Sequence, residues 1–242
     1  MNINHIHLPD WLANNWLFRK LFLIRKLFLS RVSFKHYGQM AEDISLQKFF
    51  PNLQQGFFVD VGCFHPIKYN NTYFLYRKQG WRGINIDIDS IKIEGFNIVR
   101  PKDINICQAV SSTAGELTYW TNGFYTPTVT LNKEFTEERS GKKYQYISKT
   151  VKAEPLTDII DRTKFKDRPI DLLSIDVEGH DVHVLEGLDF DRYAPKIIAV
   201  ETQLNDFQEI QQEATYKLLV NKNYTLANWV GMTLIFKHAS FN

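Results

Sequence analysis

The 242-residue sequence predicts an α/β fold of the Rossmann-like type, with a mostly parallel seven-stranded sheet covered by helices on both faces. From Phe57 onward, short apolar runs alternate with helix-like stretches, as in sheets whose parallel strands are joined by helices. The run from Gly56 to Asp60 is continuously apolar rather than alternating, which is typical of a strand buried on both faces. Two final apolar runs joined around Val230-Gly231 predict a C-terminal antiparallel hairpin at the sheet edge.

The individual elements follow from the apolar runs and the helical spacing between them. The predicted strands are Phe57–Val61, Gly83–Ile88, Ile104–Val110, Asp171–Val177, Lys196–Glu201, Tyr224–Asn228 and Thr233–Lys237, and the predicted helices are Asn71–Arg77, Ser90–Val99, Asp181–Leu188 and Phe207–Leu219. Residues 115–157 break this alternation, because they are polar and aromatic and contain turn signals at Asn122-Gly123 and Ser140-Gly141. We expect extra strands there, with a mobile loop around the charged segment Lys133–Lys143.

The composition is that of an ordinary globular protein, with 44% hydrophobic and 23% charged residues and a formal net charge of +2. So small a net charge points to no anionic partner, and no basic stripe interleaved with aromatics predicts nucleic-acid binding. Cys63 and Cys107 lie in apolar runs, without a CxxC motif, and we expect two buried reduced thiols and a cytoplasmic protein.

Residues 1–36 form a basic helical segment ahead of the main domain, residues 37–242. The stretch 11–29 is rich in Leu, Phe and Trp, but Arg19, Lys20, Arg25 and Lys26 exclude a membrane-spanning helix. A secretory signal would place its charges before the apolar stretch rather than through it. The segment therefore predicts a helix that docks on its own domain or on a second subunit, or that lies on an anionic membrane.

The first chemically informative element is the segment 57–66, where a buried strand ends in Asp60 and Gly62 allows a tight turn against a ligand. The GxGxxG motif of dinucleotide binders is absent, Pro66 removes a backbone N–H, and Asp60 would repel phosphate. A ligand with an ammonium and a sulfonium group, and no phosphate, fits this loop better. A plain strand-to-helix turn is the structural alternative.

The second element is Gly83-Ile-Asn-Ile-Asp87, one βαβ unit further on. An acidic residue at the end of a second strand commonly accepts the ribose hydroxyls of an adenosine-containing cofactor. Asp87 ends the apolar run and is the candidate, with Asp89 as the competitor.

The third element, Asp171–Asp181, delivers Asp176 and Glu178 to the same side of a strand's carboxyl end, followed by His180. Such groups could hold the cofactor's cationic end or take a proton from an acceptor. With Glu201 they could instead bind a divalent metal, although we predict no metal ligand set. In the structural alternative, Asp176 caps a helix and Glu178 makes a surface ion pair.

These elements resemble the FkbM family of S-adenosylmethionine-dependent methyltransferases, from about Tyr37 to the C-terminus. The matching stretches are Tyr37-Gly-Gln-Met-Ala-Glu-Asp43, Phe58-Val-Asp-Val-Gly62, Asn71-Thr-Tyr-Phe-Leu75, Gly80-Trp-Arg-Gly-Ile-Asn-Ile-Asp87, Ile175-Asp-Val-Glu-Gly-His180 and Val184-Leu-Glu-Gly187. The resemblance implies a class I methyltransferase fold and O-methylation of sugars or natural products, in a branch linked to surface polysaccharide biosynthesis. The expected acceptor is therefore a glycan or another small molecule.

The resemblance also implies which residues bind S-adenosylmethionine. Asp60, Gly62 and Asp87 should hold it, Ala109 and Val110 should flank the adenine, and Asp176 should lie near the methionine end; Gln39, Asp43, Cys63, Asn71 and Ile88 complete the expected set. Many relatives carry a second glycine in the first loop, whereas this chain has Phe64-His-Pro66, which leaves the exact contacts open.

A sugar hydroxyl is a poor nucleophile, so a proton acceptor should lie within hydrogen-bond reach. Glu178 and His180 are the first candidates and His65 is the third. Aromatic residues of the 115–157 segment could stack on a sugar ring, namely Tyr119, Trp120, Phe124 and Tyr125. The alternatives are a methyltransferase of non-sugar small molecules, a non-catalytic binding protein on the same fold, and a nicotinamide oxidoreductase, which the missing glycines disfavour.

Overall fold

The computed structural model describes residues 10–13, 15–25, 35–123, 126, 129–131 and 146–241, which fall into two compact units, residues 1–35 and 36–242. In the first unit, α1 (Asp10–Ala13) precedes α2 (Trp16–Ile24), and the Asn15 side chain begins α2 by accepting a hydrogen bond from the Phe18 N–H. The N-terminal helix expected over 11–29 is thus two short helices, and residues 26–29 lie outside the described part.

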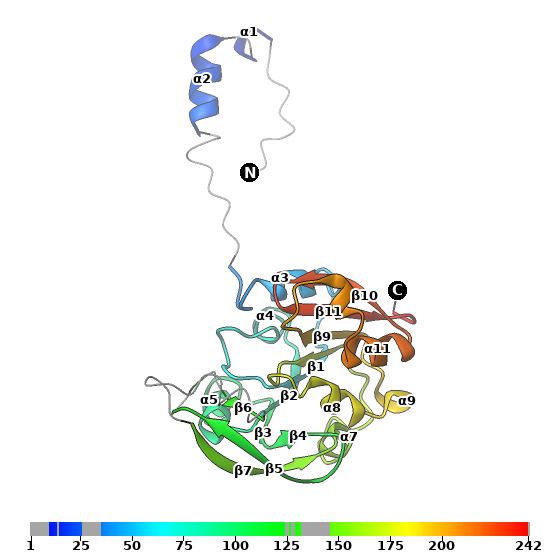
Figure 1. The fold of residues 1–242 in the computed structure, drawn as a ribbon. Coiled ribbons are helices and arrows are strands. Elements are labelled where there is room, and N and C mark those ends of the chain that lie inside the picture. Colours follow the sequence, from blue (N-terminus) through cyan, green and yellow to red (C-terminus); the bar gives the residue numbers. More distant parts are fainter. Residues whose placement is uncertain are drawn as a thin grey trace. The chain divides into compact units, whose positions relative to one another are not determined.

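The second unit is built on a seven-stranded sheet with the order β10-β11-β9-β8-β1-β2-β3 (Figure 1). Its strands are β1 (Phe57–Val61), β2 (Arg82–Asp87), β3 (Ile104–Cys107), β8 (Leu172–Ile175), β9 (Ile197–Glu201), β10 (Tyr224–Val230) and β11 (Thr233–His238). The pairs among β9, β8, β1, β2 and β3 are parallel, and β11 and β10 complete the edge antiparallel. This confirms the predicted mixed α/β fold with a mostly parallel sheet and a C-terminal antiparallel pair.

The strand order reverses beside β1. From β1 the chain proceeds outward through β2 and β3, and it then returns to β1's other side with β8 and continues outward to β9. In open parallel sheets, ligands bind at the carboxyl ends of the strands at such a reversal. The topology therefore places the ligand site at the ends of β1 and β8.

The two faces of the sheet carry two separate apolar cores, because successive side chains of a strand point to opposite faces. Val59 and Val61 belong to the core covered by α7 (Leu156–Asp161), α8 (Asp181–Glu186) and α11 (Ala214–Asn221). Phe58 belongs to the other core, with Leu46 of α3 (Glu42–Gln47) and Leu75 of α4 (Tyr73–Lys78). The remaining helices of this unit are α5 (Ser90–Val99), α9 (Phe190–Tyr193) and α10 (Phe207–Ile210).

Four further strands form a second sheet with the order β4-β7-β5-β6: β4 (Ala109–Val110), β5 (Gly115–Thr121), β6 (Val129–Thr130) and β7 (Ile147–Glu154). The extra strands expected within 115–157 are therefore present, but in a sheet of their own. The expected loop around 133–143 and the side chains of residues 124 and 125 lie outside the described part of the chain.

Three sequence expectations need correction. The strand predicted over Ile104–Val110 is divided at Gln108. The Gln108 N–H still bonds to the Asp87 carbonyl oxygen of β2, but Ala109 and Val110 pair with β7, so β3 and β4 belong to different sheets. The helix predicted over Phe207–Leu219 is interrupted before Glu213, which has an extended backbone (φ −59°, ψ 143°). Both cysteines are free thiols, but only Cys63 is buried, because Cys107 lies at the end of the edge strand β3.

Candidate active site

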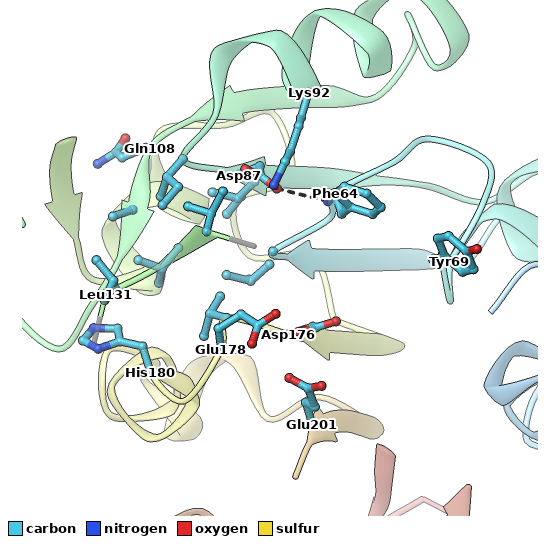
Figure 2. A pocket seen from close by; sticks show the side chains of 18 of the residues that line it. Phe64, Tyr69, Asp87, Lys92, Gln108, Leu131, Asp176, Glu178, His180 and Glu201 are labelled. Carbon is cyan, nitrogen blue, oxygen red and sulfur yellow. Dashed lines mark hydrogen bonds and ion pairs between the residues drawn. The ribbon is translucent and has the colours of Figure 1, made fainter. Parts of the chain in front are cut away.

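A cavity of about 470 Å³ opens at the carboxyl ends of the central strands, where the strand order reverses (Figure 2). Most of the residues that line it come from the ends of β1, β2, β4, β8 and β9, from the loops that follow them, and from β6 and the residue after it. Gln39 precedes α3, Lys92 lies on α5, and Met232 lies in the turn between β10 and β11. The residues that line the cavity are Gln39, Val61, Gly62, Phe64, Tyr69, Ile86, Asp87, Ile88, Lys92, Gln108, Ala109, Val110, Val129, Leu131, Asp176, Val177, Glu178, His180, Glu201 and Met232.

The loop after β1 is held tightly between the two neighbouring strands. Gly62 has φ +79°, and a Cβ atom on it would lie 1.7 Å from the carbonyl oxygen of Asp176. The N–H groups of Gly62 and Cys63 both donate to the Ile86 carbonyl, at 2.9 and 3.2 Å. The next N–H, that of Phe64, donates to Oδ2 of Asp87 at 3.1 Å. These three N–H groups are therefore already bonded within the protein, unlike the free N–H groups that cradle a pyrophosphate.

Asp60 does not line the cavity. Because side chains alternate along β1, Asp60 points away from Val59 and Val61, to the face where Ser174 and Asn85 are its register partners on the two adjacent strands. The three polar side chains form a buried row across the sheet. Asp60 contacts Asn70 and Thr72 beneath the loop, and its contact with a cofactor stays a prediction.

Arg100, which directly follows α5, bonds to residues around this buried row. Its fully buried guanidinium donates to the Pro66 carbonyl, to Oδ1 of Asn70 and to Oγ1 of Thr72 at 2.7–3.0 Å. Asn70 and Thr72 in turn donate to Oδ2 of Asp60 at 3.0 and 2.9 Å. Burial raises the pKa of Asp60, and the Arg100 charge opposes that rise. The network fixes the 62–72 loop, and Phe64 and Tyr69 of that loop line the cavity.

Four other expected site residues also lie outside the cavity lining. Asp43 accepts hydrogen bonds from the Tyr37 and Gly38 N–H groups at 3.0 and 3.2 Å, and so shapes the turn that places Gln39 in the wall. Asn71 and Cys63 do not line it either.

His65, the third candidate base, does not line the cavity either. Its Nδ1 atom accepts hydrogen bonds from the Ile67 and Lys68 N–H groups at 3.0 Å each, so the ring stabilises the 62–72 loop. Partial burial and the nearby Lys68 and Arg100 charges lower the pKa of His65.

Asp87 lines the cavity on the β2 side and is held from three directions. Its Oδ1 accepts from the Asp89 N–H at 2.9 Å, its Oδ2 accepts from the Phe64 N–H, and Lys92 lies within ion-pair distance. Burial raises the pKa of Asp87, while Lys92 and these N–H groups lower it. Asp89 instead begins α5 by accepting from the Ile91 N–H, which gives the competitor of Asp87 a structural role.

Three carboxylates, those of Asp176, Glu178 and Glu201, line the other side of the cavity (Figure 2). The Asp176 side chain is exposed to the cavity although it lies deep in the protein. Burial and the neighbouring carboxylate of Glu201 raise the pKa of Asp176 well above its usual range, and Glu178 adds to the effect. These closely spaced carboxylates disfavour one another's ionised form, and a cationic ligand group would offset that repulsion.

The turn after β8 presents Glu178 through an unusual backbone. Glu178 has φ +53° and Gly179 has φ +90°, and a left-handed conformation costs about 1–2 kcal/mol for a residue other than glycine. The Asp181 carboxylate holds the turn by accepting from the Val177 and Gly179 N–H groups at 3.4 and 3.2 Å. Burial raises the pKa of Asp181 to about 6. Asp181, rather than Asp176, makes these backbone bonds at the start of α8, and Glu178 lines the cavity.

His180 lines the cavity beside this turn, and its Nε2 atom lies 3.1 Å from Oγ of the buried Ser111. Burial, with the nearby His183, lowers the pKa of His180 to about 4. The imidazole is therefore neutral near pH 7 and can accept a proton, with Ser111 fixing the orientation of the ring.

The apolar part of the wall comes from Ile86 and Ile88 of β2 and the loop after it, from Ala109, Val110 and Val129 of the second sheet, and from Leu131 after β6. Gln108 lies beside them, and its buried Nε2 atom has no hydrogen-bond partner among the described residues. A buried amide without a partner is costly, so this donor is suited to a ligand's acceptor atom. Tyr119 and Trp120, considered for sugar stacking, do not line the cavity.

Sequence reasoning missed several residues that the structure places at the site, among them Tyr69, Lys92, Gln108 and Met232. Gln108 directly precedes Ala109 and could have been found as the polar residue at the expected end of the third strand. No sequence pattern indicated Lys92, because the orientation of α5 about its axis decides whether this side chain faces solvent or the cavity.

The described residues contain no group of three or more His, Cys, Asp or Glu side chains that could hold a metal ion, so Asp176, Glu178, His180 and Glu201 do not form one. Nor does that part of the chain include a helix long and apolar enough to cross a membrane.

The chain is thus an α/β protein whose cavity has one carboxylate beside an apolar wall and three carboxylates opposite. Residues 60–226 match the family model described as the methyltransferase FkbM domain. Because the match covers well over half of the chain, the chain belongs to the FkbM methyltransferase family, which confirms the resemblance read from the sequence. No curated protein matches the chain.

Proposed function

We propose that this chain is an S-adenosylmethionine-dependent O-methyltransferase that acts on a sugar hydroxyl of a glycan, a surface polysaccharide or a nucleotide sugar, on a Rossmann-like class I fold. One observation carries the proposal: a single cavity has Asp87 and an apolar wall on one side and a cluster of carboxylates on the other. A ligand with a nucleoside at one end and cationic groups at the other matches that distribution.

The residues present fit this cofactor. Asp87 would accept the ribose hydroxyls, Ile88, Ala109 and Val110 would flank the adenine, and the unpartnered Nε2 of Gln108 would donate to a ring nitrogen. Asp176 and Glu201 would face the ammonium and sulfonium groups. The bound cofactor supplies a methyl group activated by its positive sulfur.

This chain's own contribution to transfer is to position the acceptor and to receive its proton. Alignment of two reactants can be worth effective molarities of about 10⁵–10⁸ M. Glu178 and the neutral His180 both face the cavity and can accept the proton of an acceptor hydroxyl. The choice of a sugar acceptor rests on the resemblance to the polysaccharide-linked branch of the family, and a non-sugar alcohol is the alternative acceptor.

The test is calorimetric titration of the full chain with S-adenosylhomocysteine, with reduced nicotinamide dinucleotide as the control ligand. We expect binding of the first alone, with a dissociation constant of about 1–100 μM, which corresponds to about 5–8 kcal/mol. A folded sample that binds neither ligand would favour a non-catalytic binding protein, and one that binds the dinucleotide would contradict the site assignment. Transfer from labelled S-adenosylmethionine to nucleotide sugars, compared with non-sugar alcohols, then tests the acceptor class.

A further inference from the structure

Helix α2 of the first unit exposes large apolar side chains on all sides. None of its residues is buried, and Trp16, Leu17 and Leu21 are 70%, 55% and 58% exposed. Trp11 of α1, immediately before it, is 74% exposed. Soluble proteins rarely leave so many neighbouring apolar side chains uncovered unless the surface binds a partner.

All the charged side chains of the same helix and the residue after it are basic. The described stretch 15–25 holds Arg19, Lys20 and Arg25 and no acidic residue, and Lys20 Nζ lies 5.1 Å from the centre of the Trp16 ring. Residues 1–36 carry six Lys or Arg residues and one acidic residue, which leaves 23 of the chain's 29 basic and 26 of its 27 acidic residues for the rest. The positive charge of the chain is therefore concentrated in this segment.

The dimensions of α2 exclude a spanning role and suit an interfacial one. Its nine residues extend about 14 Å at about 1.5 Å per residue, against about 30 Å for the hydrocarbon core of a bilayer. Leu17, Leu21 and Ile24 follow the i, i+4, i+7 spacing of one helix face. Long basic side chains can extend from such a helix to lipid headgroups while tryptophan rings lie at headgroup depth.

We propose that α2, together with Trp11, binds the surface of an anionic lipid bilayer, with the helix lying in the plane of the interface. A second copy of this chain fits the same surface less well, because two α2 helices would bring together six like charges. The larger unit of the chain has nearly balanced charge, whereas an anionic bilayer presents a continuous negative surface that attracts each Lys and Arg. The inference concerns a surface outside the candidate active site and does not rest on the proposed function.

The test is co-sedimentation of the full chain with vesicles of phosphatidylcholine alone and of phosphatidylcholine mixed with phosphatidylglycerol. We expect at least tenfold stronger partitioning onto the anionic vesicles. Binding should weaken as salt shortens the screening length from about 10 Å at 0.1 M to about 3 Å at 1 M. Leu17→Ser/Leu21→Ser and Arg19→Glu/Lys20→Glu should each lower the partitioning at least tenfold.

Two matched variants of the larger unit serve as controls. Ile98→Ser/Val220→Ser removes two exposed apolar side chains, and Arg77→Glu/Lys78→Glu reverses an exposed Arg-Lys pair on α4. Both controls should bind vesicles like the unchanged chain, and melting temperatures should show that all four variants fold.

The proposal is overturned if the unchanged chain does not bind anionic vesicles, or if the α2 variants bind them as well as the controls do. Equal binding to neutral and anionic vesicles would overturn the electrostatic part. Sedimentation velocity without lipid completes the test. If the chain does not bind vesicles but forms a dimer, and Leu17→Ser/Leu21→Ser dissociates that dimer, the α2 surface binds a second copy instead.

Discussion

The Nζ atom of Lys92 lies 3.5 Å from Oδ2 of Asp87, and the two side chains are only 4% and 5% exposed. Both line the cavity, and Lys92 also lies 5.0 Å from the centre of the Phe64 ring in the loop after β1 (Figure 2). A buried carboxylate is costly without a partner, so this ammonium group keeps Asp87 in its charged form. Lys92 therefore sets the pH range over which Asp87 can accept hydrogen bonds from a ligand.

Replacing Lys92 by Met should make S-adenosylhomocysteine affinity more sensitive to acid. Burial raises the pKa of Asp87 and Lys92 lowers it, so losing Lys92 raises the pKa of Asp87 further. The contribution of ionised Asp87 is present above its folded-state pKa and is lost as pH falls through it, so the loss moves to higher pH. Calorimetry at about pH 6 and about pH 8 measures this. Lys78→Met, an exposed change on α4, is the control, and equal losses at both pH values would contradict the role of Lys92.

Asp87→Ala should weaken S-adenosylhomocysteine binding more than tenfold, equivalent to about 1.4 kcal/mol, because hydrogen bonds to a charged acceptor are worth about 1.5–3 kcal/mol. Asp89→Ala is the matched control two residues away, since Asp89 begins α5 and does not line the cavity. That control should lower helix stability slightly and leave affinity within a few fold. Unchanged affinity in Asp87→Ala would remove the ribose assignment.

Gly62→Ala should destabilise the protein more than Gly80→Ala. Both glycines have positive φ, +79° and +69°, so both variants carry the left-handed strain of about 1–2 kcal/mol. Only at Gly62 would the new Cβ meet a backbone atom, the Asp176 carbonyl oxygen, whereas nothing lies within 4 Å at Gly80. Denaturant unfolding should show an additional cost of about 1–3 kcal/mol at Gly62, as for other overpacked sites. Similar costs in both variants would show that the loop can move away from β8.

Arg100→Met should destabilise the fold by about 3–5 kcal/mol, as expected when one partner of a buried charge pair is removed. The reason is that Asp60 and the groups bonded to Arg100 would remain buried without it. Adding Asp60→Asn to this variant should recover part of the loss, because the uncompensated charge is then gone. Urea unfolding of both single variants and the double variant checks this, and additive losses would mean that the two residues do not interact.

Glu178→Gln and His180→Ala should each slow methyl transfer about 10²-fold or more while leaving S-adenosylhomocysteine affinity nearly unchanged. Because the pKa of His180 is lowered to about 4, its titration should not produce a fall in rate between pH 5 and 8. His238→Ala is the control, since this histidine bonds to Ser240 and does not line the cavity. Normal rates in both site variants would exclude them as proton acceptors, and a limb near pH 6.5 that disappears in His180→Ala would show an unperturbed imidazole.

Several features could be predicted from the sequence because they depend on local patterns. Continuous apolar runs identify strands buried on both faces, and six of the seven predicted runs became strands of the main sheet, whereas Ile104–Val110 is divided between the two sheets. Asp87 and Asp176 could be selected as cavity residues because they stand at the ends of such runs. The elements that were missed, α3, α7 and α9, are four to six residues long, too short to show a helical period.

The division of roles among the acidic residues was not visible in the sequence. Asp60 and Asp87 both end or nearly end a strand, yet Asp60 lies under a loop and Asp87 faces the cavity. Alternation along the strand gives the face, but only packing decides what covers that face. In the same way, β4 belongs to the second sheet because Ala109 and Val110 pair with β7 rather than with β2, which no local pattern indicates.

The sequence by itself determined the sheet, the family and the carboxylates at its strand ends, because periodicity, glycine and charge act over a few neighbouring residues. Only the tertiary structure decided that Arg100 bonds to Thr72, which bonds to Asp60, that Lys92 pairs with Asp87, and that the Gln108 Nε2 atom is buried without a partner among the described residues. These relationships depend on how a helix or strand is rotated against its neighbours when the core packs. That rotation is set by contacts between segments far apart in the chain.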